Sequence, residues 1–377
     1  MPLRIAAHLR HVRHYLYIVQ QADQHYQQLA QTTGLMLFDR EREQIDAAWA
    51  WLGQHLSLPG SETLFLEFTT ATVSVGDLRY DKRRERIPQL HLATEIAQRT
   101  GNTHVQAITL GNLGVAYYAL GETKQAIVYH QQALELAERI GSKSIASIAI
   151  GSLGSAYLDL GDLERAISYH ELARKSFREL GDKNNEVVAQ NALANCYLYR
   201  SEFQRAIKLY NESLAICRAD GNKRLEALSL HYLGIAYATF LHEPNKAKPL
   251  FQQSMRIYRD LGDNVGVAFS LSALGMVTRV LGDTHHAIQL YEEALATIRT
   301  YQVRHEEGKL LGNLANAYHD IGDERTALAY YLQDLAIARE LGHPITVATT
   351  LANLGDSYRI LGELDQAVTC LKEVGLC

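Results

Sequence analysis

The sequence predicts an all-α protein, a superhelical solenoid of helix-turn-helix repeats behind an N-terminal helical cap. Three observations predict it. A Leu-Gly or Leu-Ala pair recurs every 40 residues, once after 41, with its leucine at Leu113, Leu153, Leu193, Leu233, Leu274, Leu314 and Leu354. An alanine follows thirteen or fourteen residues after each leucine, and a tyrosine follows four residues after it in six of the seven copies. Such self-similarity indicates units that bury their faces only by stacking on neighbours.

Residues 1–60 lie outside this register. The stretches HYLYIVQQADQHYQQLAQ and DREREQIDAAWAWLGQHL are amphipathic, and they predict two helices separated by a short segment around Gly34. SLPGSE at 57–62 is the clearest linker in the chain. We therefore expect a helical cap over 1–60, with Trp49 and Trp51 packed on the first repeat.

Residues 64–103 form a degenerate repeat. Counting back 40 residues from Leu113 leads to Val73, and Arg86 stands where the tightly packed alanine is expected. LHLATEIAQRTGNT nevertheless echoes HQQALELAERIGSK of the next copy. The segment is predicted to be a divergent pair of helices.

Residues 104–377 contain seven repeats, the last one truncated. In most copies the first helix, helix A, ends at Gly followed by Asp or Glu, and the second, helix B, ends at another glycine. Glycine closes a helix by adopting a left-handed conformation, and the acid favours the next N-terminus. The small residue after each leucine and the alanine on helix B let the two helices approach closely, while aromatic side chains fill the remaining space.

The fourth copy is irregular. LHEPNKAKPLF adds one residue and places Pro249 inside helix B, where proline removes a hydrogen bond. The fifth copy has Thr278 in place of the tyrosine and Gln302 in place of the closing glycine. We expect a kink near 245–249 and the softest part of the array between copies four and five.

The last copy stops after about 33 residues, short of the roughly 40-residue period. Val368, Leu371 and Val374 then lie on the face that should stack on a following repeat. Either the native protein continues, or this end meets a partner, with self-association through the uncapped repeat as one possibility.

The spacing of Leu-Gly, Tyr and Ala resembles the tetratricopeptide (TPR) repeat. GNLGVAYYALGE and GNLANAYHDIGDE carry the resemblance most closely. The 40-residue form is similar to the repeats of spindle-orientation adaptors and to the C-terminal TPR sensor region of bacterial STAND-type ATPases. Residues 47–51, AAWAW, resemble the stretch that leads into that sensor region. The resemblance implies a right-handed superhelix whose A helices line a concave groove.

Composition and the lack of known motifs argue against an enzyme and against a nucleic-acid or membrane partner. The net charge is -5, from 37 basic and 42 acidic residues without long runs, which argues against nucleic acid or a membrane as partner. No P-loop, HExxH, CxxC or Gly-x-Ser-x-Gly pattern occurs. We expect no enzyme activity, no catalytic residues, no cofactor and a cytoplasmic location, with free cysteines. His11 and His14 lack companion ligands at a suitable spacing, so no metal site is predicted.

Carried over from the TPR resemblance, the groove positions indicate where a ligand binds. Asn313 and Asn316 could clamp an extended peptide backbone while Lys309 and Arg359 pair with its acids. The same asparagines could instead bond only to neighbouring helices or water. The full candidate set is Asn195, Tyr199, Tyr232, Arg279, Lys309, Asn313, Asn316, His319, Asp320, Asn353, Asp356 and Arg359.

Two functions fit the sequence. The first is a non-enzymatic scaffold that binds a peptide or protein segment in the concave groove. The alternative is the sensor or regulatory part of a larger STAND-type signalling ATPase or transcription regulator, in which the repeats hold a catalytic domain inactive.

Overall fold

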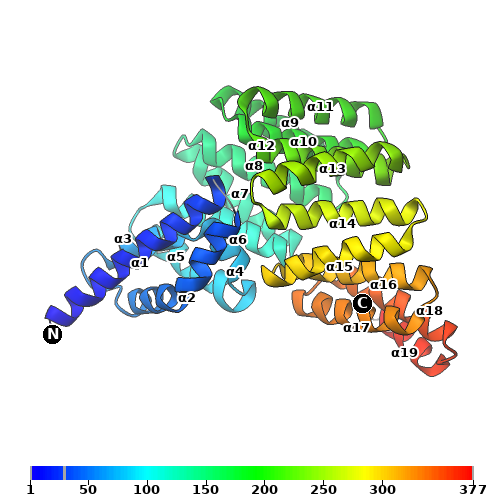
Figure 1. Ribbon diagram of the computed structural model, residues 1–377. Helices are drawn as coiled ribbons and strands as arrows, with labels where there is room; N and C mark the ends of the chain where they lie inside the picture. The colour runs from blue at the N-terminus through cyan, green and yellow to red at the C-terminus, as the bar shows by residue number, and fades with distance from the viewer. Residues whose placement is uncertain (1, 29–30, 376–377) are drawn as a thin grey trace. The chain divides into compact units, whose positions relative to one another are not determined.

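The structure, a computed structural model, describes residues 2–28 and 31–375, and every regular element in these ranges is a helix (Figure 1). The all-α prediction is therefore confirmed. The chain divides into two compact units, residues 1–209 and 210–377. Each unit has buried hydrophobic clusters of its own.

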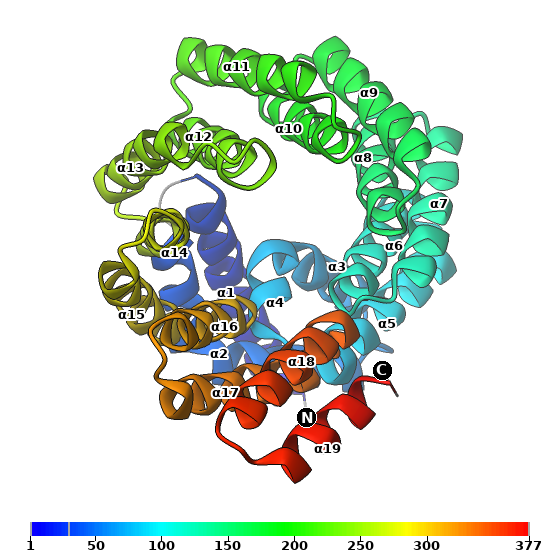
Figure 2. The ribbon, with the colours of Figure 1, turned by 90° about the vertical axis from the view of Figure 1, so that its right-hand side faces the viewer.

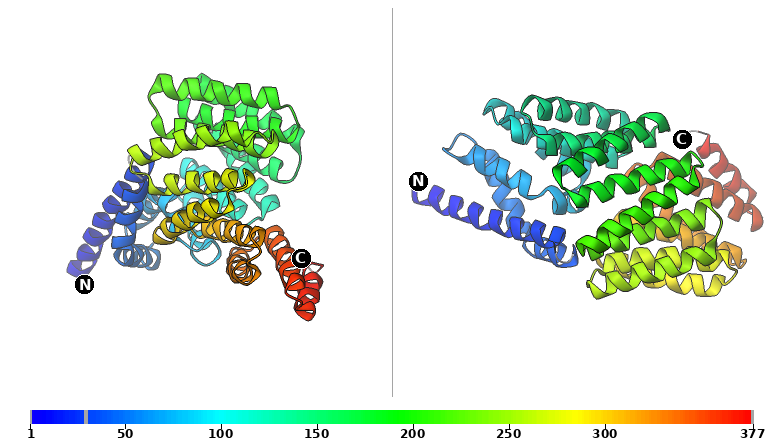
Figure 3. Two further views of the ribbon diagram at one scale, coloured as in Figure 1. Left: turned by 45° about the vertical axis from the view of Figure 1, so that its right-hand side comes forward. Right: turned by 90° about the horizontal axis from the view of Figure 1, so that it is seen from above.

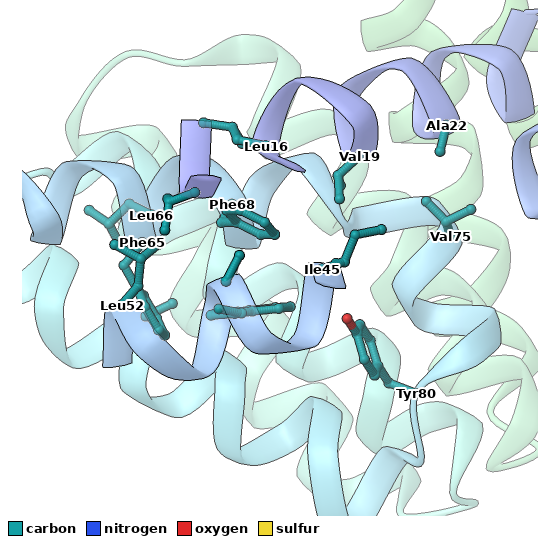
Figure 4. Packing of buried hydrophobic residues seen from close by; sticks show 14 of the residues in the cluster. Leu16, Val19, Ala22, Ile45, Leu52, Phe65, Leu66, Phe68, Val75 and Tyr80 are labelled. Atoms are coloured by element: carbon teal, nitrogen blue, oxygen red, sulfur yellow. The ribbon is translucent and has the colours of Figure 1, made fainter. Parts of the chain in front are cut away.

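Unit 1 begins with helices that precede the regular repeats. They are α1 (Pro2–Gln28), α2 (Gln31–Gln54), α3 (Ser61–Ala71), α4 (Val73–Arg79), the π-helical η1 (Lys82–Arg86) and α5 (Ile87–Arg99). Their core is aromatic: the Trp49 ring lies 5.9 Å from Phe65, 5.7 Å from Phe68 and 5.8 Å from Tyr80. Figure 4 shows Phe65, Phe68 and Tyr80 converging with Ile45 on this core. Trp49 is thus a core residue, whereas Trp51 is half-buried and stacks on His8 and His55.

The predicted separation of the first two helices around Gly34 is wrong. Gly34 lies inside α2, and a Cβ at this position would come within 2.4 Å of the Ala22 carbonyl oxygen on α1. The glycine is therefore a point of close approach between two helices. Glycine is used both for close approach and for turns, and the sequence alone does not distinguish the two.

The degenerate repeat departs from a simple pair of helices. Where helix A is expected, the chain is divided into α3 and α4 at Thr72, and η1 precedes α5. Arg86 has no exposed surface and donates to Thr72 Oγ1 at 3.1 Å. A buried guanidinium needs far more room than the alanine of the other copies, so two straight helices cannot approach here as they do elsewhere.

The regular repeats of unit 1 are antiparallel helix pairs. Gly121 and Gly161 close the turns between them with φ of 73° and 76°, as predicted. Asp162 and Asp182 accept hydrogen bonds from backbone amides at the starts of the following helices. The helices are α6 (Thr103–Ala119), α7 (Thr123–Arg139), α8 (Lys143–Asp159), α9 (Leu163–Leu180), α10 (Lys183–Tyr199) and α11 (Phe203–Asp220), the last of which contains the boundary between units.

Unit 2 continues the same pattern. Its helices are α12 (Lys223–Ile235), η2 (Ala236–Phe240), α13 (Pro244–Asp260), α14 (Asn264–Val280), α15 (Thr284–Thr300), α16 (Arg304–Asp320), α17 (Glu324–Leu341), α18 (Pro344–Ile360) and α19 (Leu364–Val374). Within this unit the A helices α12, α14, α16 and α18 form one layer and the B helices form the other (Figures 2 and 3). We call the surface of the four A helices the A-helix face of unit 2.

Close packing of small against large residues is confirmed, with one change of side chain. A Cβ at Gly275 would lie 2.6 Å from the Tyr291 ring, so helices A and B touch at this point. In the first two copies the ring is a histidine: Gly114 faces His130 and Gly154 faces His170. In the first, second and sixth copies the helix A tyrosine stacks on a tyrosine of helix B, as Tyr157 does on Tyr169 at 5.4 Å.

The irregular fourth copy takes up its extra residue before Pro249. The end of its helix A widens into η2, and His242 adopts a left-handed φ of 53°. Helix α13 then continues without a break through Pro249. The irregular backbone therefore lies at 236–243, upstream of the expected kink.

The C-terminal helix has an exposed apolar stripe. On α19, Val368 is 48% and Leu371 is 59% exposed, while Ala367 and Cys370 are buried against α18. Val374, expected on the same open face, is half-buried against the cluster that contains Tyr331 and Leu354. Self-association through this stripe stays a prediction.

Candidate functional site

Ten of the twelve predicted site residues lie in unit 2, on four successive A helices. Tyr232 comes from α12 and Arg279 from α14, five residues come from α16, and three from α18. Asn195 and Tyr199 lie on α10 in unit 1. The ten are Tyr232, Arg279, Lys309, Asn313, Asn316, His319, Asp320, Asn353, Asp356 and Arg359.

The repeat places these residues together for a simple reason. Residues three or four apart lie on one side of a helix, so Asn313, Asn316 and Asp320 form one row along α16. The 40-residue period puts Asn353 and Asp356 of α18 at the positions of Asn313 and Asn316. Rows on adjacent A helices therefore face the same surface.

Two polar contacts join the rows across adjacent A helices. Arg279 Nη1 on α14 donates to Asp320 Oδ2 on α16 at 2.7 Å. Asn353 Nδ2 on α18 donates to Asn316 Oδ1 on α16 at 3.5 Å. The A-helix face of unit 2 is thus a connected polar surface over α14, α16 and α18.

Tyr331 of α17, one of the helix B aromatics expected only to fill the space between helices, supports this surface. Its hydroxyl donates to Asn316 Oδ1 at 2.6 Å. Burial, with a smaller effect of the Glu324 and Asp320 carboxylates, raises the pKa of Tyr331 to about 12, although Arg279 opposes the shift. The hydroxyl is therefore a permanent donor at neutral pH, and it fixes the orientation of the Asn316 amide.

The cations of the site pair with carboxylates of the chain itself. Lys309 Nζ lies 2.9 Å from Glu306, and Arg359 Nη2 lies 2.6 Å from Asp356. The expectation that both cations pair with a ligand's acids stays a prediction. Such exposed pairs contribute little stability and exchange readily, so they position the cations without burying them.

His319 is held in the same way. Its Nδ1 lies 2.9 Å from Glu324 Oε1, and Glu324 is itself almost fully buried. The imidazole at the end of α16 is therefore oriented by the first turn of α17. The sequence pattern did not predict this contact because the two residues belong to different helices.

Asn313 differs from the other amides. It is half-buried on α16, and its side chain makes no hydrogen bond with any residue in the described ranges. Of the two readings of the asparagines, Asn316 and Asn353 follow the one in which they bond to neighbouring helices. Among the described residues, both the donor and the acceptor of the Asn313 amide are therefore open.

The predicted site residues of unit 1, Asn195 and Tyr199, lie on a separate A helix, α10. Tyr199 is 60% exposed on α10, and Asn195 is half-buried one turn earlier. Burial raises the pKa of Tyr118 on α6, and Asp159 and Tyr199 add to this effect, so the three groups interact across three A helices.

Other candidates for chemistry are inert or isolated in the structure. Cys196 is completely buried, and burial raises the pKa of its thiol to about 11. His11 and His14 both pack against Tyr15 on α1. Within residues 2–28 and 31–375, no group of three or more His, Cys, Asp or Glu could hold a metal ion. No helix in the same ranges has the length and hydropathy needed to cross a bilayer.

Comparison with known proteins agrees with the repeat architecture. The tetratricopeptide repeat family model matches residues 87–139, 144–219, 220–300 and 306–374. Human G-protein-signaling modulator 1 is 32% identical over 93 residues, which are 24% of this chain and only 13% of that protein.

Two solved structures share the fold at low sequence identity. A Rap protein complexed with Competence and Sporulation Factor has a TM-score of 0.64 and 11% identity, covering 98% of this chain and 97% of that one. A STAND protein with a tetratricopeptide repeat sensor from Pyrococcus horikoshii has a TM-score of 0.52 and 16% identity, covering 89% of this chain and 52% of that one. Because the family model matches well over half of the chain, and the helix pairs show its packing, the chain belongs to the tetratricopeptide repeat family.

Proposed function

We propose that the chain is a binding scaffold and that the A-helix face of unit 2 binds an extended segment of another protein. The family and its fold support a role in protein interaction. The observation that carries the proposal is that the Asn313 amide makes no hydrogen bond in the described ranges. Neighbouring site residues such as Asn316 and Arg359 already have polar partners within the chain.

The arrangement suits a peptide backbone. An asparagine amide can accept from a backbone N–H and donate to the carbonyl of the same residue, whatever the peptide's side chains. Asn353 lies one repeat further on. Its Nδ2 is as far as 3.5 Å from Asn316 Oδ1, so this hydrogen bond is weak and a ligand carbonyl can replace it. The ion pairs around them supply charges of both signs for neighbouring side chains of the ligand.

In the test, a library of displayed peptides is first selected for binding to the full chain. The selected peptide is titrated by fluorescence anisotropy against the parent chain, Asn313→Ala and the control Glu293→Ala, which changes an exposed residue of α15. We expect Asn313→Ala to weaken binding by about 1 to 3 kcal/mol, as the loss of hydrogen bonds to the peptide would. Glu293→Ala should bind like the parent chain.

Equal affinity of Asn313→Ala and the parent chain would move the site elsewhere, and circular dichroism checks that both variants keep their helices. Asn195 and Tyr199 of unit 1 are not needed for this proposal and stay predictions. The cytoplasmic location and the exclusion of nucleic-acid and membrane partners also stay predictions.

A second candidate is the regulatory part of a larger signalling ATPase or transcription regulator. It is favoured by the matches to longer proteins, since this chain covers 52% of the Pyrococcus horikoshii STAND protein and its matched segment covers 13% of the human relative. Sequencing the gene upstream of Met1 tests it. A P-loop domain in the same reading frame would support this candidate, whereas a stop codon immediately upstream would support the scaffold.

A further inference from the structure

The first half of α1 is basic, and its charge is not balanced by contacts within the chain. Arg4, Arg10 and Arg13 all precede Asp23, the first acidic residue of the sequence. Within residues 2–28 and 31–375, no carboxylate lies within ion-pair distance of these three guanidiniums. Most other arginines of the described chain are paired, as Arg79 is with Asp39 at 2.7 Å. The start of α1 therefore differs in charge from the rest of the surface.

Two of these arginines belong to an exposed stripe that also contains an aromatic ring. His14 and Tyr17 follow Arg10 by four and seven residues, and Arg13 follows it by three, so the four side chains lie on one side of the helix. All four are exposed, and Tyr17 is 57% exposed. In both views of Figure 3, α1 lies at the outer edge of the unit 1 helices. We call these four residues the α1 stripe.

The acidic residues of the neighbouring helices do not neutralise the stripe. Asp23, further along α1, accepts from the backbone amides of Ser74 and Val75 on α4. Glu43 on α2 and Glu67 on α3 are exposed, but neither makes an ion pair with the arginines of α1. The other acids of α2 and α3 have cationic partners of their own, and they are Asp39, Glu41, Asp46 and Glu62.

The surroundings of the stripe favour a short acidic segment over a larger polyanion. Val12, Leu16 and Val19 on the opposite side of α1 are buried in the core, so the helix has no free apolar face to insert into a lipid bilayer. The whole chain has a net charge of -5 although α1 begins with cations, so the remaining surface repels an extended polyanion such as nucleic acid. The stripe is about 10 Å long, which matches about three extended residues.

We propose that the α1 stripe binds a short acidic segment of another protein. The guanidiniums of Arg10 and Arg13 pair with Asp or Glu side chains of the segment, in charge-assisted hydrogen bonds. The Tyr17 ring covers an apolar side chain beside them, and arginine and tyrosine are both enriched at protein interfaces. Because the stripe is exposed, salt screens this contact. The site goes beyond the proposed function, since it uses a different helix in a different unit.

The probe is the capped, fluorescein-labelled peptide Glu-Glu-Leu-Glu-Glu-Leu-Glu-Glu-Leu, titrated with the full chain at low salt and followed by fluorescence anisotropy. We expect saturable binding that weakens as salt is added. The analogue with glutamine in place of every glutamate should bind about tenfold more weakly, because its charge-assisted contacts are lost. Equal binding of the two peptides, or no saturation with the glutamate peptide, would overturn the proposal.

A matched pair of double variants locates the site. Arg10→Gln/Arg13→Gln should weaken binding of the glutamate peptide about tenfold. The control Arg256→Gln/Arg259→Gln removes the same charge from exposed positions with the same spacing on α13, where Asp260 follows directly. The control should bind like the parent chain. Equal weakening by both double variants would show that only net charge matters, and would overturn the proposal.

Further measurements separate this site from the A-helix face and from other anions. Asn313→Ala should bind the glutamate peptide like the parent chain. Weaker binding by Asn313→Ala together with unchanged binding by Arg10→Gln/Arg13→Gln would place the peptide on the A-helix face and sink the proposal. Phosphatidylserine vesicles and single-stranded oligothymidylate serve as competitors at equal anionic charge, and either should displace the labelled peptide less well than the unlabelled peptide does. Better displacement by either would assign the stripe to lipid or nucleic acid.

Discussion

At the scale of single residues, the ring of helix B that packs against the glycine of helix A contributes to how stability depends on pH. His130 and His170 are 2% exposed against Gly114 and Gly154, and His170 leaves both ring nitrogens without a partner in the described ranges. Phe251 fills the equivalent notch at Gly234. Burial lowers the pKa of both histidines to about 4, so they are neutral in the folded protein.

Unit 1 should therefore lose stability in mild acid. As the pH falls below about 6.5, the unfolded chain binds protons at these histidines while the folded chain does not until about pH 4. Their contribution is full above pH 6.5 and declines below it, by at most about 1.4 kcal/mol per histidine and pH unit. Urea unfolding followed by circular dichroism at pH 7 and pH 5 measures the loss.

The control is the double variant His130→Phe/His170→Phe, which copies the pair of Gly234 and Phe251. It should unfold with a weaker dependence on pH between these two values. His231, whose pKa burial also lowers to about 4, remains in both proteins, so some dependence persists. The same slope in both proteins would contradict the assignment.

The sequence could predict where a glycine of helix A lets helix B approach closely. It could not predict every ring that packs there, or the hydrogen-bond partners of the site residues. Leu-Gly and alanine positions follow from the period, whereas the fit of an imidazole against Gly114 depends on the distance between two helices. Likewise the groove positions Asn313 and Asn316 were predictable, but the bond from Tyr331 to Asn316 was not, since it joins helices A and B. Spacing along a helix determines the face on which a residue lies, and tertiary packing determines what it meets there.

At the scale of elements, two glycines of α6 show why the motif contains a glycine at all. A Cβ at Gly114 would lie 2.4 Å from the His130 ring, but a Cβ at Gly111, one turn earlier, would meet nothing within 4 Å. Both residues are inside the helix. Only the first glycine is needed for close approach of the two helices.

The two substitutions by alanine should therefore have opposite effects. Gly114→Ala should lower the free energy of unfolding by about 1 to 3 kcal/mol through overpacking. Gly111→Ala should raise it by about 1 kcal/mol, because alanine is the better helix former. Chemical denaturation of the two variants beside the parent chain measures both, and equal effects of the two substitutions would show that helix propensity alone decides.

Elements were predictable where the repeat is regular and failed where one side chain breaks it. The glycine turns at Gly121 and Gly161 follow the expected positions. The division at Thr72 and the π-helical η1 beside Arg86 were not foreseen, because the pattern does not tell how the chain accommodates a buried guanidinium. Gly34 shows the converse, because this glycine lies inside α2 and marks a close approach to α1 instead of the end of a helix.

At the scale of the whole molecule, stability in a repeat protein is a sum of local terms, so one irregular copy can open without its neighbours. The segment 236–243 combines two weaknesses within unit 2. It contains the π-helical η2 and the left-handed His242. Pro249 then removes one hydrogen bond from the first turns of α13.

Amide hydrogen exchange of the full chain should therefore be faster over 236–248 than over the regular turn between α14 and α15, residues 277–287. The reason is the smaller free energy of local opening where the backbone is strained and bonds are missing. His242→Gly should slow exchange in this segment, since glycine relieves about 1 kcal/mol of left-handed strain, and should leave 277–287 unchanged. Uniform protection across 225–305 in the parent chain would contradict a soft fourth copy.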